Sequence, residues 1–189
     1  MTSAKRLHYS YDDYLELLSR SDFKLEYCDG VIYAMAGGTI AHGMLAAAAI
    51  RALGQALLGR CTILSSDAKV RVEATDLSTF PDASIVCGDV ASSTTDRHAV
   101  VNPALLVEVT SRSTEDYDRG DKLSHYKQIP SLKAVIFVSH RTRALTIVAR
   151  SEKGWEETVV RGGEQLLLAE PALRVPVDAL YDGITLDER

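Results

Sequence analysis

Helical and strand-like spacings of hydrophobic residues alternate along the chain. Residues Tyr11–Ser19 have the spacing of a short amphipathic helix, and Ser10 before them is a suitable N-cap. Phe23–Cys28 and Val31–Ala36 flank Asp29-Gly30, a pair typical of the tight turn in a β-hairpin. The first part of the chain is therefore predicted to form a helix followed by a hairpin.

The strongest helix prediction covers Ile40–Leu58, which is rich in Ala and Leu and contains no proline. Gly59 follows it as a suitable C-terminal stop. Residues 68–73 then alternate strictly between apolar and charged positions, which predicts a strand with Lys69 and Arg71 on a solvated face.

A strand–helix–strand unit is predicted in the second half of the chain. Ala134–Val138 is apolar throughout and residues 105–110 are apolar apart from Glu108 and Thr110, as expected of strands that are covered on both faces. Between them, Ser113 and Asp116 have the spacing of a capping box, so we expect a helix from about residue 114 to about Gln128. The two strands should then be parallel.

The remaining segments complete a mixed sheet with helices on its faces. We expect a short strand at residues 84–87, a polar loop over 88–102, antiparallel strands at residues 145–149, 155–160 and 165–168, and a last helical turn at 177–181. This order predicts an α/β (α+β) fold in a single domain, residues 1–189.

Composition narrows the class of protein. The chain has 189 residues, of which 46% are hydrophobic and 25% charged, and its net charge is −5. That balance argues against a general nucleic-acid coat protein, but not against a nuclease, because a carboxylate site is acidic until its metal binds. The amino-terminal residues lack the apolar core of a signal peptide, and no apolar run reaches the length of a membrane span.

The cysteines predict a cytoplasmic protein with free thiols. Cys28, Cys61 and Cys87 are odd in number and show no CxxC spacing. An unpatterned set of this kind also argues against a zinc site.

Glu108 is the residue that most clearly suggests chemistry. It lies inside the apolar segment 104–110, where an ionised carboxylate is unfavourable unless it has a partner. Asp82 stands just before another apolar stretch, so two acids from adjacent strands could bind one Mg²⁺ or Mn²⁺ ion. The Val109 carbonyl is a possible third ligand. Alternatively, Glu108 is a lone buried acid that an arginine or backbone donors satisfy.

A metal site of this kind needs a nearby cation. The usual place for this cation is two residues after the glutamate on the same strand, but here that position is Thr110. Lys122 in the following helix is the candidate, because Asp118, Lys122 and Tyr126 share one helical face. The alternative is an ordinary Asp118–Lys122 pair on the surface.

Two further residues are weaker candidates. Glu26, in the first hairpin, is either part of the site or a solvated strand carboxylate. His42, in the first turn of the long helix, is either a phosphate contact or water-positioning group, or a structural histidine packed against the core.

Taken together, these residues resemble the Uma-type family of putative restriction endonucleases, which is placed in the PD-(D/E)XK nuclease superfamily. The resemblance extends over about residues 10–180, and any one segment is weak alone. The matching segments are 24–30 (KLEYCDG), 35–42 (MAGGTIAH), 65–72 (SSDAKVRV), 81–87 (PDASIVC), 102–114 (NPALLVEVTSRST) and 117–130 (YDRGDKLSHYKQIP).

The resemblance implies a restriction-endonuclease-like core, a mixed sheet flanked by helices, with an N-terminal helix–hairpin–helix extension. It also implies a Mg²⁺-dependent endonuclease acting on double-stranded DNA. Asp82, Glu108 and the Val109 carbonyl would be the metal ligands and Lys122 the displaced lysine, with Glu26 and His42 in the same cleft. A homodimer is expected because symmetric cutting of a duplex needs two sites. Two alternatives stay open: a non-catalytic binding or regulatory module, and a hydrolase of another phosphodiester.

Overall fold

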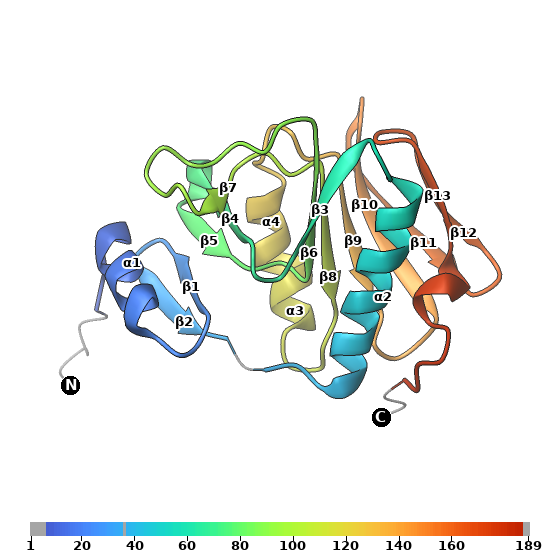
Figure 1. Ribbon diagram of the computed structural model, residues 1–189, viewed down its shortest axis with the longest axis horizontal. Coiled ribbons are helices and arrows are strands. Elements are labelled where there is room, and N and C mark those ends of the chain that lie inside the picture. Colours follow the sequence, from blue (N-terminus) through green and yellow to red (C-terminus); the bar gives the residue numbers. More distant parts are fainter. Residues whose placement is uncertain (1–6, 36, 187–189) are drawn as a thin grey trace.

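A six-stranded sheet lies at the centre of the molecule in the computed structural model, which describes residues 7–35 and 37–186 (Figure 1). Its strand order is β11-β10-β9-β8-β6-β3. The strands are β3 (Cys61–Ser65), β6 (Ala83–Cys87), β8 (Leu105–Val109), β9 (Ala134–Val138), β10 (Ala144–Ser151) and β11 (Gly154–Arg161). β8 and β9 are parallel, as predicted, and the other neighbours are antiparallel.

A five-stranded sheet, in the order β2-β1-β5-β4-β7, lies beside the central sheet together with the first helix (Figure 1). Its elements are α1 (Tyr11–Arg20), β1 (Leu25–Cys28), β2 (Val31–Ala34), β4 (Lys69–Val72), η1 (Glu73–Thr75), β5 (Leu77–Thr79) and β7 (Ala99–Val100). The buried Tyr14 of α1 donates a hydrogen bond to the Leu25 carbonyl, which fixes the helix on β1.

Helices cover both faces of the central sheet. α2 (Ile40–Ala56) packs Leu45 and Leu53 against one face, which includes Leu105, Val107 and Val109 of β8. The opposite face is covered by α3 (Glu115–Tyr117), η2 (Asp118–Lys122) and α4 (Leu123–Tyr126). Because side chains alternate along a strand, Glu108 points to the α4 side of the sheet.

The predicted start of the chain is confirmed. Ser10 and Asp13 form a reciprocal capping box at the start of α1. β1 and β2 pair as an antiparallel hairpin whose turn residues Asp29 and Gly30 have positive φ angles of 43° and 80°. Ala36, the last residue of the predicted second strand, lies outside the described residues.

The prediction of a half-solvated strand at residues 68–73 is wrong. All four residues of β4 are buried, including Lys69 and Arg71. The Lys69 ammonium lies 2.5 Å from Asp96 Oδ2, and the Arg71 guanidinium stacks 3.8 Å above the Tyr11 ring and pairs with Asp76. The charged side chains therefore face a second layer, formed by α1 and the segment around residue 96, instead of solvent.

The prediction of one continuous helix after β8 is also wrong in detail. The segment from Glu115 to Tyr126 is interrupted by a π-helical turn, η2. The predicted capping box does not form: the N-cap of α3 is Thr114, and its side chain makes no capping hydrogen bond. The sequence reveals the helical period but not a single wider turn within it.

Several strands were not predicted. β3 and β5 were missed, β7 lies within the predicted loop over residues 88–102, and β12 (Gln165–Leu168) pairs with β13 (Leu173–Pro176) instead of continuing the antiparallel strands β10 and β11. The predicted last helical turn is present as η3 (Val177–Leu180).

The cysteine prediction is wrong for two of the three thiols. Cys61 and Cys87 are cross-strand partners on β3 and β6, and they form a disulfide. Their separation of 26 residues carries no sequence pattern, so only the register of the two strands brings them together. Cys28 is a free thiol. Among the described residues, no helix is long and apolar enough to cross a membrane.

Candidate active site

Asp82 and Glu108 lie side by side at the end of two adjacent strands. The β6–β8 ladder ends with Ala83 opposite Val107, so Asp82 and Glu108 are the residues that directly follow this last pair. The Val109 N–H donates a 2.7 Å hydrogen bond to Asp82 Oδ2, which fixes the aspartate across the strand junction. The strand register thus brings together the two acids that the sequence singled out.

Glu108 is buried and has two close partners on the α4 side of the sheet. Its side chain is only 6% exposed. The Tyr126 hydroxyl donates a 2.5 Å hydrogen bond to Glu108 Oε1, and the Lys122 ammonium lies 3.0 Å from the same oxygen. The partners of Glu108 are therefore a lysine and a tyrosine, not the arginine or backbone donors of the simpler alternative.

Lys122 connects three carboxylates. Besides Glu108, its ammonium lies 3.4 Å from Glu26 Oε1 and 3.6 Å from Asp118 Oδ1. The lysine side chain is 5% exposed, and the side chains of Glu26 and Asp118 are nearly as buried. The interpretation of Asp118–Lys122 as an ordinary surface pair is therefore wrong.

Glu26 reaches this cluster from the five-stranded sheet. The Thr79 hydroxyl and the Phe80 N–H, both just before Asp82 in the chain, donate hydrogen bonds to Glu26 Oε1. The glutamate is 7% exposed, so the alternative of a solvated strand carboxylate is wrong. The cluster therefore spans both sheets.

His42 contacts Asp82 from the first turn of α2. Thr39 caps α2 by accepting a hydrogen bond from the His42 N–H, which places this residue in the first helical turn. The imidazole Nε2 lies 3.4 Å from Asp82 Oδ2. A β-carbon at Gly38 would come within 2.8 Å of His42 Nδ1, so the glycine allows the ring to occupy this position. His42 and Asp82 are 23% and 15% exposed, which makes them the solvent-accessible part of the site.

The pKa shifts follow from burial and from the neighbouring charges. Burial raises the pKa of Glu108 to about 7, the Lys122 charge opposes that rise, and the Asp82 and Asp118 charges add to it. Burial lowers the pKa of Lys122, but its anionic neighbours outweigh that effect and hold it well above its usual value. The hydrogen bond to Asp82 raises the pKa of His42, against the effect of burial.

The donors at Asp82 and Glu108 fit a hard divalent cation. The contacts of Glu108 described above use Oε1, and those of Asp82 use Oδ2, so the second oxygen of each carboxylate is not engaged by them. Within residues 7–35 and 37–186, no group of three or more His, Cys, Asp or Glu side chains is arranged to hold a metal. Mg²⁺ needs only one or two carboxylates, because waters and substrate phosphate complete its shell.

Sequence reasoning did not assign every member of the cluster. Tyr126 and Asp118 were visible as residues on the same helical face as Lys122, but nothing in the sequence showed that the face is buried against Glu108. Thr79 and Gly38 carried no sequence signal, because their roles depend on contacts with Glu26 and His42.

The chain is similar to one described protein family and to two proteins from Synechocystis. A family described as "Uma2: Putative restriction endonuclease" matches residues 11–178. The Synechocystis protein slr1290, itself uncharacterised, is 33% identical over 177 residues, which are 93% of this chain and 92% of the relative. The Synechocystis protein sll1609, also uncharacterised, is 26% identical over 127 residues, covering 67% and 72% of the two chains.

One solved structure shares the fold. The crystal structure of a putative nuclease of the DUF820 family from Anabaena variabilis superposes with a TM-score of 0.75, covering 92% of this chain and 98% of that one. The sequence identity is 12%, so this match concerns the fold alone. It agrees with the predicted α+β class and mixed sheet.

Proposed function

Because the chain belongs to the Uma2 family, whose members are described as putative restriction endonucleases, we propose that it is a Mg²⁺-dependent endonuclease that hydrolyses phosphodiester bonds in DNA. The observation that carries this proposal is the position of Asp82 and Glu108, which directly follow the last pair of the β6–β8 ladder. The Val109 N–H donates to Asp82, and the Lys122 ammonium lies 3.0 Å from Glu108.

Each residue of the site has a distinct role in this proposal. Asp82, Glu108 and the Val109 carbonyl would hold the ion, which polarises the phosphate and lowers the pKa of a bound water. Lys122 would orient the attacking water and offset the charge that develops on the phosphate, as a compact ammonium can.

The residues around Lys122, Glu108 and Asp82 would hold these groups and the substrate in place. Glu26 and Asp118 hold the Lys122 ammonium between them, and Tyr126 holds the carboxylate of Glu108. His42, at the exposed side of Asp82, would contact the phosphate of the substrate. Its raised pKa favours the cationic imidazolium that such a contact requires.

The direct experiment is incubation of the protein with supercoiled plasmid in the presence and absence of Mg²⁺ or Mn²⁺. We expect metal-dependent nicking by the native protein. Asp82→Asn, which keeps the shape of the side chain but removes the negative charge, should nick at least about 10²-fold more slowly. If the plasmid stays supercoiled during incubation with the folded native protein and either metal, the proposal is wrong.

One observation favours the alternative of a non-catalytic binding module. The Lys122 charge is fully surrounded by carboxylates, an arrangement that can serve purely as a structural ion cluster. Calorimetric titration with Mn²⁺ separates the two functions. Binding that disappears in both Asp82→Asn and Glu108→Gln supports the enzyme, whereas no binding supports the module.

We also propose that the substrate is duplex DNA and that the protein acts as a homodimer, since symmetric cutting of two strands needs two sites. Sedimentation of the protein alone and with a duplex tests the dimer. Parallel cleavage assays on duplex DNA, single-stranded DNA and RNA test the substrate and also the alternative of another phosphodiester.

A further inference from the structure

A groove lined by three arginines lies beyond the α3–α4 segment. Its volume is about 490 Å³. Arg119, Arg143 and Arg161 line it together with the hydroxyls of Ser139, Thr142 and Thr146, and none of the described residues that line it is an aspartate or a glutamate. We call it the arginine groove. In a chain of net charge −5, this local excess of cations requires an explanation.

The arginine groove lies on the same face of the central sheet as Glu108. The strand registers place Glu108 opposite Phe137 on β9, Phe137 opposite Thr146 on β10, and Thr146 opposite Val159 on β11. These neighbouring strands lie in succession across the sheet (Figure 1). At about 4.8 Å per strand, Thr146 is roughly 10 Å and Val159 roughly 14 Å from Glu108.

Arg119 joins the groove to the candidate active site. It follows Asp118 in η2, and its guanidinium lies 5.1 Å from the ring of Phe137, the neighbour of Glu108. Its Nη2 donates a 3.0 Å hydrogen bond to Thr146 Oγ1 on the floor of the groove. Arg119 therefore connects the groove to the helical segment that carries Asp118 and Lys122.

The arginines have weak partners that an anion could replace. Arg119 Nε lies 3.3 Å from Glu115 but makes no hydrogen bond within the described part of the chain, and Arg143 lies 3.3 Å from Asp178. The side chains of Arg119 and Arg143 are 32% and 53% exposed, and ion pairs this exposed contribute little. Among the described residues, no carboxylate forms an ion pair with Arg161.

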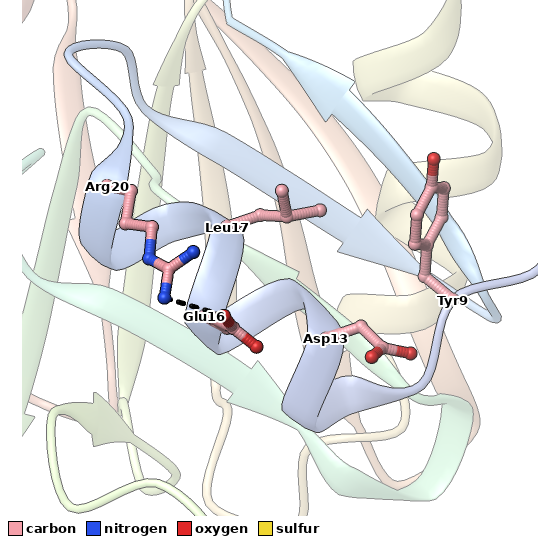
Figure 2. A pocket seen from close by; sticks show the side chains of 5 residues that line it. All are labelled: Tyr9, Asp13, Glu16, Leu17 and Arg20. Atoms are coloured by element: carbon pink, nitrogen blue, oxygen red, sulfur yellow. Dashed lines mark ion pairs between the residues drawn. The ribbon is translucent and has the colours of Figure 1, made fainter.

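A second depression provides a contrast. It lies along α1 and has a volume of about 370 Å³. Figure 2 shows that its one cation, Arg20, is paired with Glu16, while Asp13 adds a second carboxylate. Its charge balance repels an anion, so the two depressions differ in chemistry as well as in place.

We propose that the arginine groove binds a backbone phosphate of the nucleic acid, a few nucleotides from the phosphodiester that is cut. This inference rests on the proposed function. Guanidinium groups bind phosphate through paired hydrogen bonds, and the surrounding hydroxyls can donate to the same oxygens. Measured along the axis of a duplex, roughly 10–14 Å corresponds to about three or four base pairs, at about 3.4 Å each.

The test is DNA binding at a series of salt concentrations, measured by fluorescence anisotropy with a short duplex and with EDTA present so that no cleavage occurs. The variants are Arg161→Ala and the double variant Arg143→Ala/Arg161→Ala. Arg174→Ala is the matched control, because it removes an exposed arginine from a strand outside the groove. Melting curves establish that each variant is folded.

We expect the slope of log K against log salt to decrease by about 0.9 in total when the groove no longer neutralises its phosphate, and to be unchanged in the Arg174 control. In cleavage assays the groove variants should raise KM and leave kcat unchanged, because the groove is remote from the reacting atoms.

Equal slopes for the groove variants and the control would overturn the inference, as would failure of the native protein to bind the duplex. A melting shift caused by inorganic phosphate, lost in the double variant without any effect on DNA binding, would also overturn it by identifying a free-phosphate site. If the native protein cleaves DNA but the groove variants bind DNA normally, the phosphate-binding role of the groove is wrong and the proposed function stands. If binding depends on the groove arginines but the native protein cleaves no DNA, the proposed function is wrong and the phosphate-binding role stands.

Discussion

Glu108 is held as an ionisable group in surroundings that disfavour its charge. Burial raises the pKa of its carboxyl to about 7, against the opposing effects of the Lys122 charge and the Tyr126 hydrogen bond. A purely structural residue at this position would be more stable as an uncharged side chain. A retained carboxylate with this pKa is typical of a functional site.

Replacing Glu108 by Gln should change how stability depends on pH. A carboxyl whose folded pKa is about 7 and whose ordinary value is 4.5 binds more protons in the folded state between these values. It therefore makes the native protein less stable as pH rises across that window. Without metal, Glu108→Gln should remove this decline and be as stable as the native protein, or more so, at neutral pH.

Urea unfolding of the native and Glu108→Gln proteins across that window is the measurement. Asp82→Asn removes a charge that raises the Glu108 pKa, so it should lower this pKa and end the decline at a lower pH than in the native protein. A variant that is far less stable than the native protein at neutral pH would indicate that the ionised Glu108 is part of a structural ion network.

Lys122→Ala should lower turnover by roughly 10²-fold or more while metal binding survives, because the lysine positions the reactants but is not a ligand. Stability should also fall, by about 3–5 kcal/mol, since three buried carboxylates lose their shared cation. Lys122→Arg should restore little activity because the guanidinium is larger.

Lys127→Ala is the matched control for Lys122, because it removes a lysine from the end of the same helical segment. Cleavage rates, Mn²⁺ titrations and melting curves for the three variants give the comparison. Normal cleavage by Lys122→Ala would remove this residue from the catalytic site.

Single residues could be predicted from the sequence where burial was evident from their neighbours. Glu108 stands within an apolar run and Asp82 just before one, so their types and places were informative. The burial of Glu26 was not evident, since it comes from Thr79 and Phe80 in a distant part of the chain. The contact of Gly38 with His42 was invisible for the same reason.

At the level of elements, the π-helical turn η2 sets the position of Lys122. Asp118 and Lys122 mark its two ends, and Gly120 lies at its middle with no atom within 4 Å of its missing β-carbon. The turn is one residue wider than an α-helical turn, so it changes the direction in which the residues after it point.

Deleting Gly120 should convert η2 to an α-helical turn. Lys122 could then no longer contact Glu108 and Asp118 at the same time. We expect loss of cleavage similar to that of Lys122→Ala. Gly120→Ala is the control: it preserves the turn, meets no neighbour and should stabilise the helix by roughly 0.5–1 kcal/mol. Cleavage and melting are measured for both. An active deletion variant would show that the wider turn is irrelevant to the site.

The elements differ in how well the sequence predicts them. α1, the β1–β2 hairpin and the parallel β8–β9 pair were predicted because local caps, turn residues and apolar runs determine them. β4 was assigned a solvated face because alternation shows only that one face is polar, not what covers it. The Cys61–Cys87 disulfide depends on the β3–β6 register, which no local pattern contains.

For the whole molecule, the candidate site joins two sheets. Glu26 comes from the five-stranded sheet, Glu108 from the six-stranded sheet, and Lys122 connects them. A metal that binds only the folded protein stabilises it, by about 2.7 kcal/mol when its concentration is 100 times the dissociation constant.

Mn²⁺ should therefore raise the melting temperature of the native protein but not that of Asp82→Asn. Asp178→Asn is the control, because this exposed aspartate pairs with Arg143 and lies outside the candidate active site. Thermal unfolding over a range of Mn²⁺ concentrations is the measurement. An equal shift in Asp82→Asn would place the metal elsewhere.

The most direct test of the central claim is metal-dependent cleavage of supercoiled plasmid by the native protein and by Asp82→Asn, with melting curves to establish that both are folded. The account predicts that the native protein nicks or linearises the plasmid only when Mg²⁺ or Mn²⁺ is present, and that the variant cleaves at least about 10²-fold more slowly. Equal cleavage by the two proteins, or none by either, would contradict the assignment of Asp82 and Glu108 as the catalytic metal site.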